Sequence, residues 1–205
     1  MSMCRLGGIL LTGGSSTRMG ADKARLTVGG TPLSRRLGRL LVPLVDLAVE
    51  VGEGASELRA VREAPSGAGP LAAIGAGYTE LLNMGLSPDV ACLVLACDLP
   101  HLNSSVLGRI ARWPGDQSVL PVIGNFAQPL CARWSSHDLH QVVHALQRGE
   151  SSLQSLPDRE GAILLDERTW GGESIAFEDV DRPEDLVRLN LHSHEHISIP
   201  DLPPR

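Results

Sequence analysis

The feature that most constrains the fold is the apolar run at 90–96 (VACLVLA), which ends at Cys97-Asp98. A short run with no polar alternation is typical of a strand buried on both faces, as in parallel sheets that helices cover. Strands are predicted at 7–12, 44–51, 90–96, 118–122 and 129–134, and more weakly at 57–63, 162–165 and 175–177. Helices are predicted at 32–42, 71–82, 104–113, 135–148 and 183–191. This alternation predicts an α/β protein with a mostly parallel sheet, helices on both faces and a small antiparallel part.

The 205 residues suit one domain with one sizeable core, and the chain shows no internal repeat and no interdomain linker. We therefore expect a single domain over residues 1–190. The segment 191–205 is rich in His, Ser and Pro and is expected to be a mobile tail.

Composition excludes several functions. The net charge of −6 disfavours binding to nucleic acid or to an anionic membrane. No apolar run approaches the ~18 residues that span a bilayer, and the N-terminal segment lacks a signal-like apolar region, so we expect a cytoplasmic protein. The four cysteines form no CxxC pair, so buried reduced thiols are expected rather than a zinc site. No nucleophile motif accompanies the histidines, which are expected to be exposed or in the tail.

The strongest chemical pattern is the loop at 11–24 (LTGGSSTRMGADKA). Its glycines, among them Gly13 and Gly14, allow backbone N–H groups to turn toward an anion. Arg18 and Lys23 add two cations, so the loop can hold a triphosphate. The spacing is neither that of a Walker A loop nor that of a GxGxxG dinucleotide fingerprint.

Carboxylates lie at further positions where a ligand cleft is expected. Asp98 ends the run at 90–96 and can bind Mg²⁺, which takes few carboxylates besides phosphate oxygens, although a turn or capping role is the alternative. Asp181 is a candidate second metal ligand, although residues 179–185 also look like the acidic first turn of a helix.

A second loop suits a base or ribose. The tight turn of Gly69, Pro70 and Leu71 leads into a helix and allows close approach of a ligand, although a plain turn with Pro at the first helical position is the alternative. Glu63, just upstream, can meet a sugar hydroxyl or a base edge, or is a surface acid.

With these residues assembled, the chain resembles the molybdenum cofactor guanylyltransferase family of MobA-like nucleotidyltransferases. The segment 11–24 resembles that family's LAGGxSxRMGxDKA loop. Segments 67–73 (GAGPLAA), 95–100 (LACDLP), 128–134 (QPLCARW) and 179–186 (DVDRPEDL) resemble its later motifs, in the same order. The resemblance covers about residues 7–189 and implies a three-layer, Rossmann-like nucleotidyltransferase fold.

The resemblance also implies roles. Leu11, Thr12 and Gly13 would contact guanine through backbone groups, and Lys23 would bind phosphates. Glu63 would replace an acidic nucleotide-binding residue, usually Asp. Asp98 would bind Mg²⁺ and touch the nucleotide. The implied reaction transfers GMP from GTP to the phosphate of molybdopterin and releases pyrophosphate, with possible hand-over contacts to other cofactor-biosynthesis proteins.

The sequence departs from the family pattern at further positions. Thr12 replaces Ala, Ala73 replaces Gly, Asp181 replaces Asn and Arg182 replaces Thr. These changes keep nucleotide binding as the expectation and leave the acceptor open. The alternatives are a cytidylyl- or sugar-phosphate nucleotidyltransferase, or a nucleotide-binding homologue without catalysis.

Overall fold

The computed structural model of this chain describes residues 5–13, 26–28, 30–65, 67–150, 153, 161–180 and 185. The strands are β1 (Gly7–Leu11), β2 (Thr27–Val28), β3 (Thr31–Pro32), β4 (Leu47–Val51), β5 (Arg59–Val61), β6 (Cys92–Ala96), β7 (Val119–Ile123), β8 (Phe126–Ala127), β9 (Cys131–Trp134) and β10 (Ile163–Leu165). The helices are α1 (Leu33–Leu41), α2 (Pro70–Asn83), α3 (Ser104–Ala111) and α4 (Ser136–Gln147), with 3₁₀ turns η2 (Val42–Leu44), η4 (Glu167–Trp170) and η5 (Glu173–Phe177).

The described strands form a main sheet in the order β10-β7-β9-β6-β1-β4-β5, with β8 paired to β7, and a small sheet of β2 and β3. β1 pairs in parallel with β4 and β6, and β4 pairs in parallel with β5. β9 runs antiparallel to both β6 and β7. The prediction of a mostly parallel sheet with an antiparallel part is therefore confirmed.

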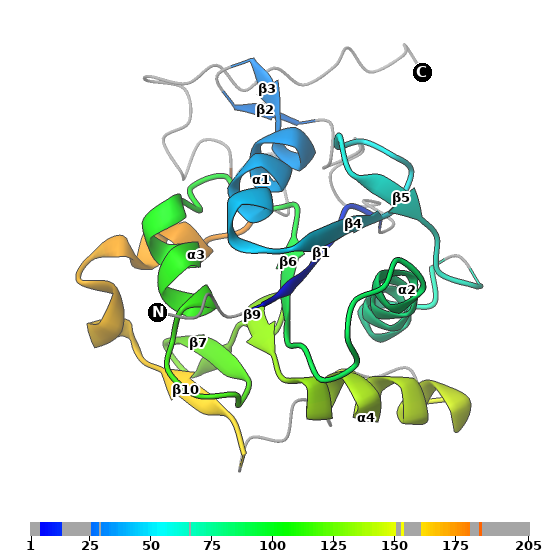
Figure 1. Cartoon of the computed structure of the whole chain (residues 1–205). Coiled ribbons are helices and arrows are strands. Elements are labelled where there is room, and N and C mark those ends of the chain that lie inside the picture. The colour runs from blue at the N-terminus through cyan, green and yellow to red at the C-terminus, as the bar shows by residue number, and fades with distance from the viewer. Residues whose placement is uncertain are drawn as a thin grey trace.

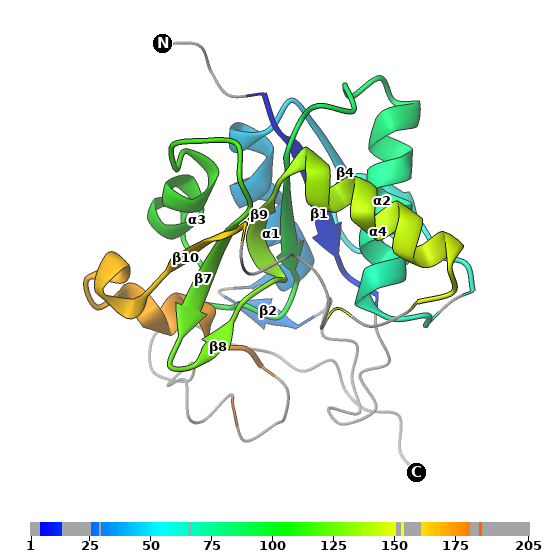
Figure 2. The same ribbon diagram turned by 90° about the horizontal axis from the view of Figure 1, so that it is seen from below.

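Helices cover both faces of this sheet, which gives three layers (Figures 1 and 2). α1 and α3 lie on one face, where Leu10 and Leu95 belong to the same apolar cluster as α1 and α3 side chains. α2 and α4 lie on the other face, where Ile9 and Val94 join their side chains in a second cluster. Neighbouring residues of β1 and β6 thus serve opposite cores, as the period of two in a strand requires.

The helix starts follow from local chemistry. Asn103 caps α3 by accepting a hydrogen bond from the Val106 N–H (3.0 Å), and Ser135 caps α4 by accepting one from the Asp138 N–H (3.1 Å). The helix predicted at 32–42 begins one residue later than expected. Thr31 and Pro32 pair with β2 instead, Pro32 is extended (φ −55°, ψ 139°), and the helix begins at Leu33.

Two further sequence predictions have different outcomes. The strand expected at 175–177 is wrong, because the segment forms the 3₁₀ turn η5, which buries Ala176 and Phe177 and leaves Ile175 exposed. The edge of the Phe177 ring meets Trp170, with centroids 4.8 Å apart. The helix expected at 183–191 lies outside the described residues, apart from position 185. Among the described helices, none has the length and apolar character needed to cross a membrane.

Candidate active site

The carboxyl ends of four parallel strands meet at one edge of the sheet. Leu11 of β1 is in register with Val51 of β4 and with Ala96 of β6, and Val51 is in register with Val61 of β5. The residues that follow these ends therefore emerge side by side, where ligands bind in open α/β sheets. They are Thr12 and Gly13 after β1, Gly52 after β4, Arg62 and Glu63 after β5, and Cys97 and Asp98 after β6.

The backbone after β1 is held on both sides. The N–H groups of Thr12 and Gly13 both donate to the Val51 carbonyl, at 3.0 and 3.1 Å. On the other side, the Cys97 N–H donates to the Leu11 carbonyl at 3.0 Å. The loop that begins at Thr12 therefore starts from a fixed point between β4 and β6. Leu11 is 6% exposed and Thr12 9%, so little of either side chain is accessible to a ligand.

Glu63 connects this loop to the start of α2. Its Oε1 accepts a hydrogen bond from the Gly67 N–H at 3.0 Å. A Cβ built on Gly13 would lie 3.9 Å from Oε2 of the same carboxylate. One acidic side chain therefore stands between the loop after β1 and the turn before α2, as a residue that meets a nucleotide sugar or base would.

The start of α2 lies at the same edge. Gly69 has a φ of 97°, a left-handed conformation that favours glycine, and Pro70 occupies the first turn. An α-helix leaves its first N–H groups without intrahelical partners, so this end can accept ligand oxygens. The Leu71 side chain is fully buried in the core, so only its backbone is available to a ligand.

Asp98 follows β6 and is partly buried. Its carbonyl accepts a hydrogen bond from the Val180 N–H at 3.0 Å, which brings the segment before Asp181 across the end of β6. Burial, together with a smaller contribution from the negative charge of Asp98, raises the pKa of the neighbouring Cys131 thiol to about 12. The Asp98 carboxylate therefore lies near the start of β9, in the segment 128–134.

Four predicted site residues lie outside the described part of the chain: Gly14, Arg18, Lys23 and Asp181. The described residues supply the loop start, the acidic residue Glu63, the α2 turn and Asp98. The binding of the triphosphate by Arg18 and Lys23 remains a prediction from the sequence.

The residues around Asp98 suit a magnesium ion. Among the described residues, no group of three or more His, Cys, Asp or Glu side chains could hold a metal alone. Mg²⁺ does not need such a group, because it is commonly held by one or two carboxylates together with substrate phosphates and water. A single partly buried carboxylate at a strand end fits that pattern and does not fit a structural zinc site.

The α4 histidines take no part in this arrangement. His137 and His144 are exposed on α4, as expected. His140 is partly buried, with its ring 5.9 Å from the Tyr78 ring.

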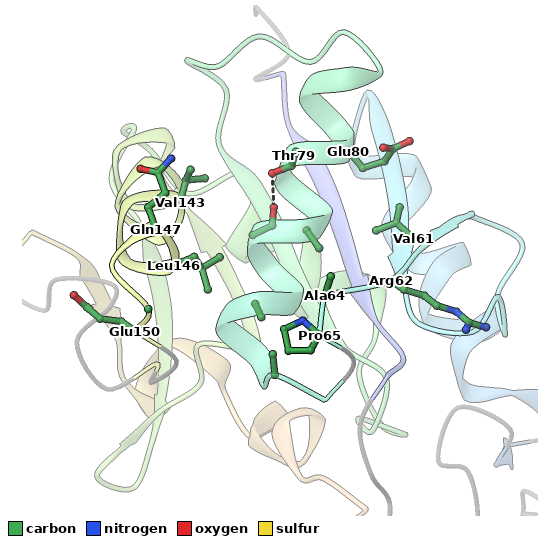
Figure 3. Close-up of a pocket in the computed structure, with 15 residues that line it drawn as sticks. Val61, Arg62, Ala64, Pro65, Thr79, Glu80, Val143, Leu146, Gln147 and Glu150 are labelled. Carbon is green, nitrogen blue, oxygen red and sulfur yellow. Dashed lines mark hydrogen bonds between the residues drawn. The ribbon is translucent and has the colours of Figure 1, made fainter.

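A groove of about 720 Å³ runs beside α2 (Figure 3). The loop residues Ala64 and Pro65 line one side, and Val143 and Leu146 of α4 line the other. Thr79 points toward it while its hydroxyl donates to the Gly75 carbonyl at 2.8 Å. Among the described residues that line this groove, Gly13, Glu63 and Asp98 do not appear. The candidate site is therefore defined by the register of the parallel strands and by the hydrogen bonds at their ends, and not by this groove.

Sequence reasoning missed one polar residue at this edge. Glu50 lies inside the apolar strand β4, is fully buried, and accepts a hydrogen bond from the Thr12 hydroxyl at 2.6 Å. Its only sequence signal is an acidic residue within an apolar run (LAVEV).

The fold defines a class: an α/β protein whose mostly parallel sheet is covered by helices and presents a candidate ligand site at the carboxyl ends of its parallel strands. The family model for the MobA-like NTP transferase domain matches residues 8–162. The chain therefore belongs to the MobA-like NTP transferase family, which confirms the resemblance seen in the motifs and the nucleotidyltransferase class.

Named relatives agree. The chain is 34% identical over 199 residues to a probable molybdenum cofactor guanylyltransferase of Opitutus terrae, covering 89% of this chain and 94% of that one. It is 31% identical over 196 residues to the molybdenum cofactor guanylyltransferase of Cereibacter sphaeroides, covering 90% and 95%.

A solved structure shares the fold. The molybdopterin-guanine dinucleotide biosynthesis protein A of Archaeoglobus fulgidus superposes with a TM-score of 0.70 at 20% identity, covering 90% of this chain and 96% of that one.

Proposed function

We propose that this protein transfers GMP from GTP to the terminal phosphate of molybdopterin in the cytoplasm and releases pyrophosphate. The observation that carries the proposal is the common register of β1, β4, β5 and β6, which brings Gly13, Glu63 and Asp98 to one edge. The names of the relatives in Opitutus terrae and Cereibacter sphaeroides support the choice of guanylyl transfer and of the acceptor.

The reaction balances without a protein nucleophile. An oxygen of the acceptor phosphate forms a bond to the α-phosphorus of GTP, and the bond from that phosphorus to the β-phosphate oxygen breaks. Pyrophosphate leaves with the bonding electrons, and no proton need be removed from an acceptor phosphate that is already anionic. Catalysis then depends on positioning and on offsetting charge.

The residues divide this work. The backbone at Leu11, Thr12 and Gly13 would contact the base, and Glu63 would meet the ribose or the base edge. Lys23 and Arg18 would offset charge on the β- and γ-phosphates. Asp98, with Asp181 as the candidate second ligand predicted from the sequence, would hold Mg²⁺. When bound, that ion supplies positive charge to the phosphate oxygens.

Thermal unfolding with GTP, CTP, ATP and UTP, each with Mg²⁺, tests the nucleotide. A ligand at about 100 times its Kd stabilises the native state by about 2.7 kcal/mol, which is roughly 5–10 °C in Tm for a chain of this size. We expect that shift with GTP alone. A preference for CTP would indicate a cytidylyltransferase, and no shift with any nucleotide would refute the proposal.

Variants and turnover complete the test. Asp98→Asn should remove the GTP·Mg²⁺ shift. Asp89→Asn should keep it, because Asp89 is exposed and lies before the amino end of the same strand. Pyrophosphate release that requires both GTP and molybdopterin would support the transferase, whereas GTP binding without release would indicate a non-catalytic homologue.

A further inference from the structure

The Glu50 carboxylate collects five hydrogen bonds inside the protein. Oε1 accepts from the Thr12 hydroxyl (2.6 Å), the Gly54 N–H (2.9 Å) and the Ala55 N–H (2.7 Å). Oε2 accepts from the N–H (2.7 Å) and the hydroxyl (2.5 Å) of Ser56. Four of these donors belong to the turn after β4, and one, Thr12, belongs to the loop after β1.

Two neighbouring residues, Glu50 and Gly52, constrain the position of the Thr12 hydroxyl. Glu50 receives its hydrogen, and Gly52 leaves room for its oxygen, because a Cβ on Gly52 would lie only 2.1 Å from Oγ1. The hydroxyl also lies 3.4 Å from the Val51 carbonyl. The N–H groups of Thr12 and Gly13 both donate to that carbonyl. Backbone hydrogen bonds therefore fix Thr12 and Gly13, and the hydrogen bond of the Thr12 side chain adds to them.

We infer that Glu50 is a positioning residue which, through the Thr12 hydroxyl, fixes the start of the nucleotide-binding loop and sets the affinity for the nucleotide. The inference rests on the proposed function for the identity of that ligand. Thr12 and Gly13 are the residues whose backbone would meet the base, and Glu50 itself touches no ligand.

The ionised form of Glu50 suits this role. Burial acts to raise its pKa, but the hydrogen bonds from Ser56, Thr12 and the backbone of Ser56 and Ala55 outweigh burial and hold the pKa below its ordinary value. An anion surrounded by donors binds a hydroxyl more firmly than a neutral acceptor does.

A purely structural role makes a different prediction. If Glu50 only stabilised the turn after β4, the loss of either hydroxyl donor would have the same effect. Ser56 and Thr12 each donate one hydroxyl hydrogen bond to this carboxylate, but only Thr12 lies in the loop. Ser56→Ala is therefore the matched control for Thr12→Val.

The test measures the Kd of GTP·Mg²⁺ by calorimetry and the steady-state kinetics of the full chain. Thr12→Val should raise Kd and the KM for GTP by about tenfold while kcat changes by less than about threefold. Thr12→Ser, which keeps the hydroxyl, should restore both within about twofold. Ser56→Ala should leave Kd within about twofold even though it lowers Tm.

Amide hydrogen exchange without nucleotide separates this inference from the proposed function. Exchange at Thr12 and Gly13 should be faster in Thr12→Val than in Ser56→Ala. Equal exchange and equal Kd in these two variants would overturn the positioning role. If the unmodified protein bound no nucleotide, the proposed function would fail, and the exchange of these two amides alone would decide the role of Glu50.

Discussion

Glu50 shows what a single charged residue requires inside an apolar strand. A buried carboxylate is tolerated only where donors replace its water, and here the Thr12 hydroxyl, the Ser56 hydroxyl and three N–H groups do so. The donors come from two loops that are distant in the sequence. The stability of this edge of the sheet therefore depends on the charge of one side chain.

Glu50→Gln should show that dependence as a function of pH. Because the pKa of Glu50 is lowered in the folded state, its stabilisation is complete above its ordinary value of 4.5 and is lost as the pH falls through the folded-state value. At pH 7 we expect the variant to lose about 2–3 kcal/mol in the free energy of unfolding. Urea unfolding between pH 7 and pH 3 should show the difference from the unmodified protein shrinking below pH 4.5. A difference that stays constant over this range would show that Glu50 is not ionised in the native protein.

Lys23 is the residue whose loss should most directly affect the transfer step. Because it would offset charge on the leaving phosphates, Lys23→Ala should lower kcat/KM for GTP by roughly 10²–10⁴-fold, as the loss of one preorganised donor does. Pyrophosphate release with varied GTP measures this. Arg5→Ala is the control and should change kcat/KM little, because Arg5 is an exposed cation that pairs with Asp46 at 3.2 Å before the amino ends of β1 and β4. A loss below tenfold for Lys23→Ala would refute its role.

How far individual site residues can be predicted depends on where their partners lie. Gly13 and Asp98 could be selected from the sequence because each follows a predicted strand and strand ends form the cleft. Glu63 could be selected because it stands just upstream of the glycine-rich turn that leads into a helix. Glu50 could not, because its donors Gly54, Ala55 and Ser56 converge only when the turn after β4 has formed. The hydrogen bond from the Gly67 N–H to Glu63, and the closeness of this carboxylate to Gly13, also appear only in three dimensions.

At the scale of elements, glycines decide how closely a helix approaches the sheet. Gly77 of α2 lies against β1 and β4, where a Cβ would come within 2.6 Å of Ile9 Cγ2 and 3.0 Å of Val51 Cγ2. Gly38 of α1 is also helical, but the nearest atom to its Cβ would be 3.7 Å away. The two helices therefore use glycine for different reasons.

Alanine substitutions should separate these reasons. Gly38→Ala should stabilise the protein by about 0.5–1 kcal/mol, since alanine is the better helix former and the space is free. Gly77→Ala gains the same propensity but forces α2 from the sheet, at a cost of about 1–3 kcal/mol, so it should be destabilising. Thermal unfolding of both variants measures the opposite signs. A rise in Tm for Gly77→Ala would contradict the tight approach of α2.

Strands could be predicted from the sequence where burial leaves a clear pattern of apolar residues. The strands at 7–11 and 92–96 were found because both of their faces are buried, which leaves an unbroken apolar run. The strand at 47–51 was found from an apolar run that only Glu50 interrupts. The segment 175–177 misled because its apolar residues pack in a 3₁₀ turn against Trp170. The β2–β3 pair was missed because two-residue strands carry no period.

At the scale of the whole molecule, both apolar cores contain buried cysteines: Cys92 in one, and Cys97 and Cys131 in the other. Cys92 belongs to the cluster under α2 and α4, and Cys131 to the cluster under α1 and α3. Burial raises the pKa of each thiol to about 12, with Asp98 adding to the effect at Cys131 and a backbone hydrogen bond opposing it at Cys92. Each thiol can therefore report on the opening of its own face of the sheet.

Thiol labelling should show whether the two faces open together. At pH 8 only about one buried thiol in 10⁴ would be ionised, whereas an unfolded cysteine has a pKa near 8.5, so both should react almost entirely through opened molecules. When reclosing is faster than labelling, the rate follows the population of the open form. Alkylation with iodoacetamide, followed residue by residue by mass spectrometry, should give equal rates for Cys92 and Cys131 if residues 1–190 form one cooperative domain. Complete reaction of both in concentrated guanidinium is the control.

Nucleotide binding extends the same measurement to function. A ligand that binds only the native state lowers the open population by the factor 1 + [L]/Kd, so GTP·Mg²⁺ at about 100 times its Kd should slow labelling at both cysteines by about 100-fold. Cys131 lies near Asp98, whereas Cys92 lies at the start of β6, at the other edge of the sheet from the candidate site. Slowing at Cys131 alone would mean that the nucleotide protects only the strand ends and that the two faces open separately. Equal slowing at both would mean that the site is coupled to the folding of the entire sheet, as expected when the loop it depends on is anchored between β4 and β6.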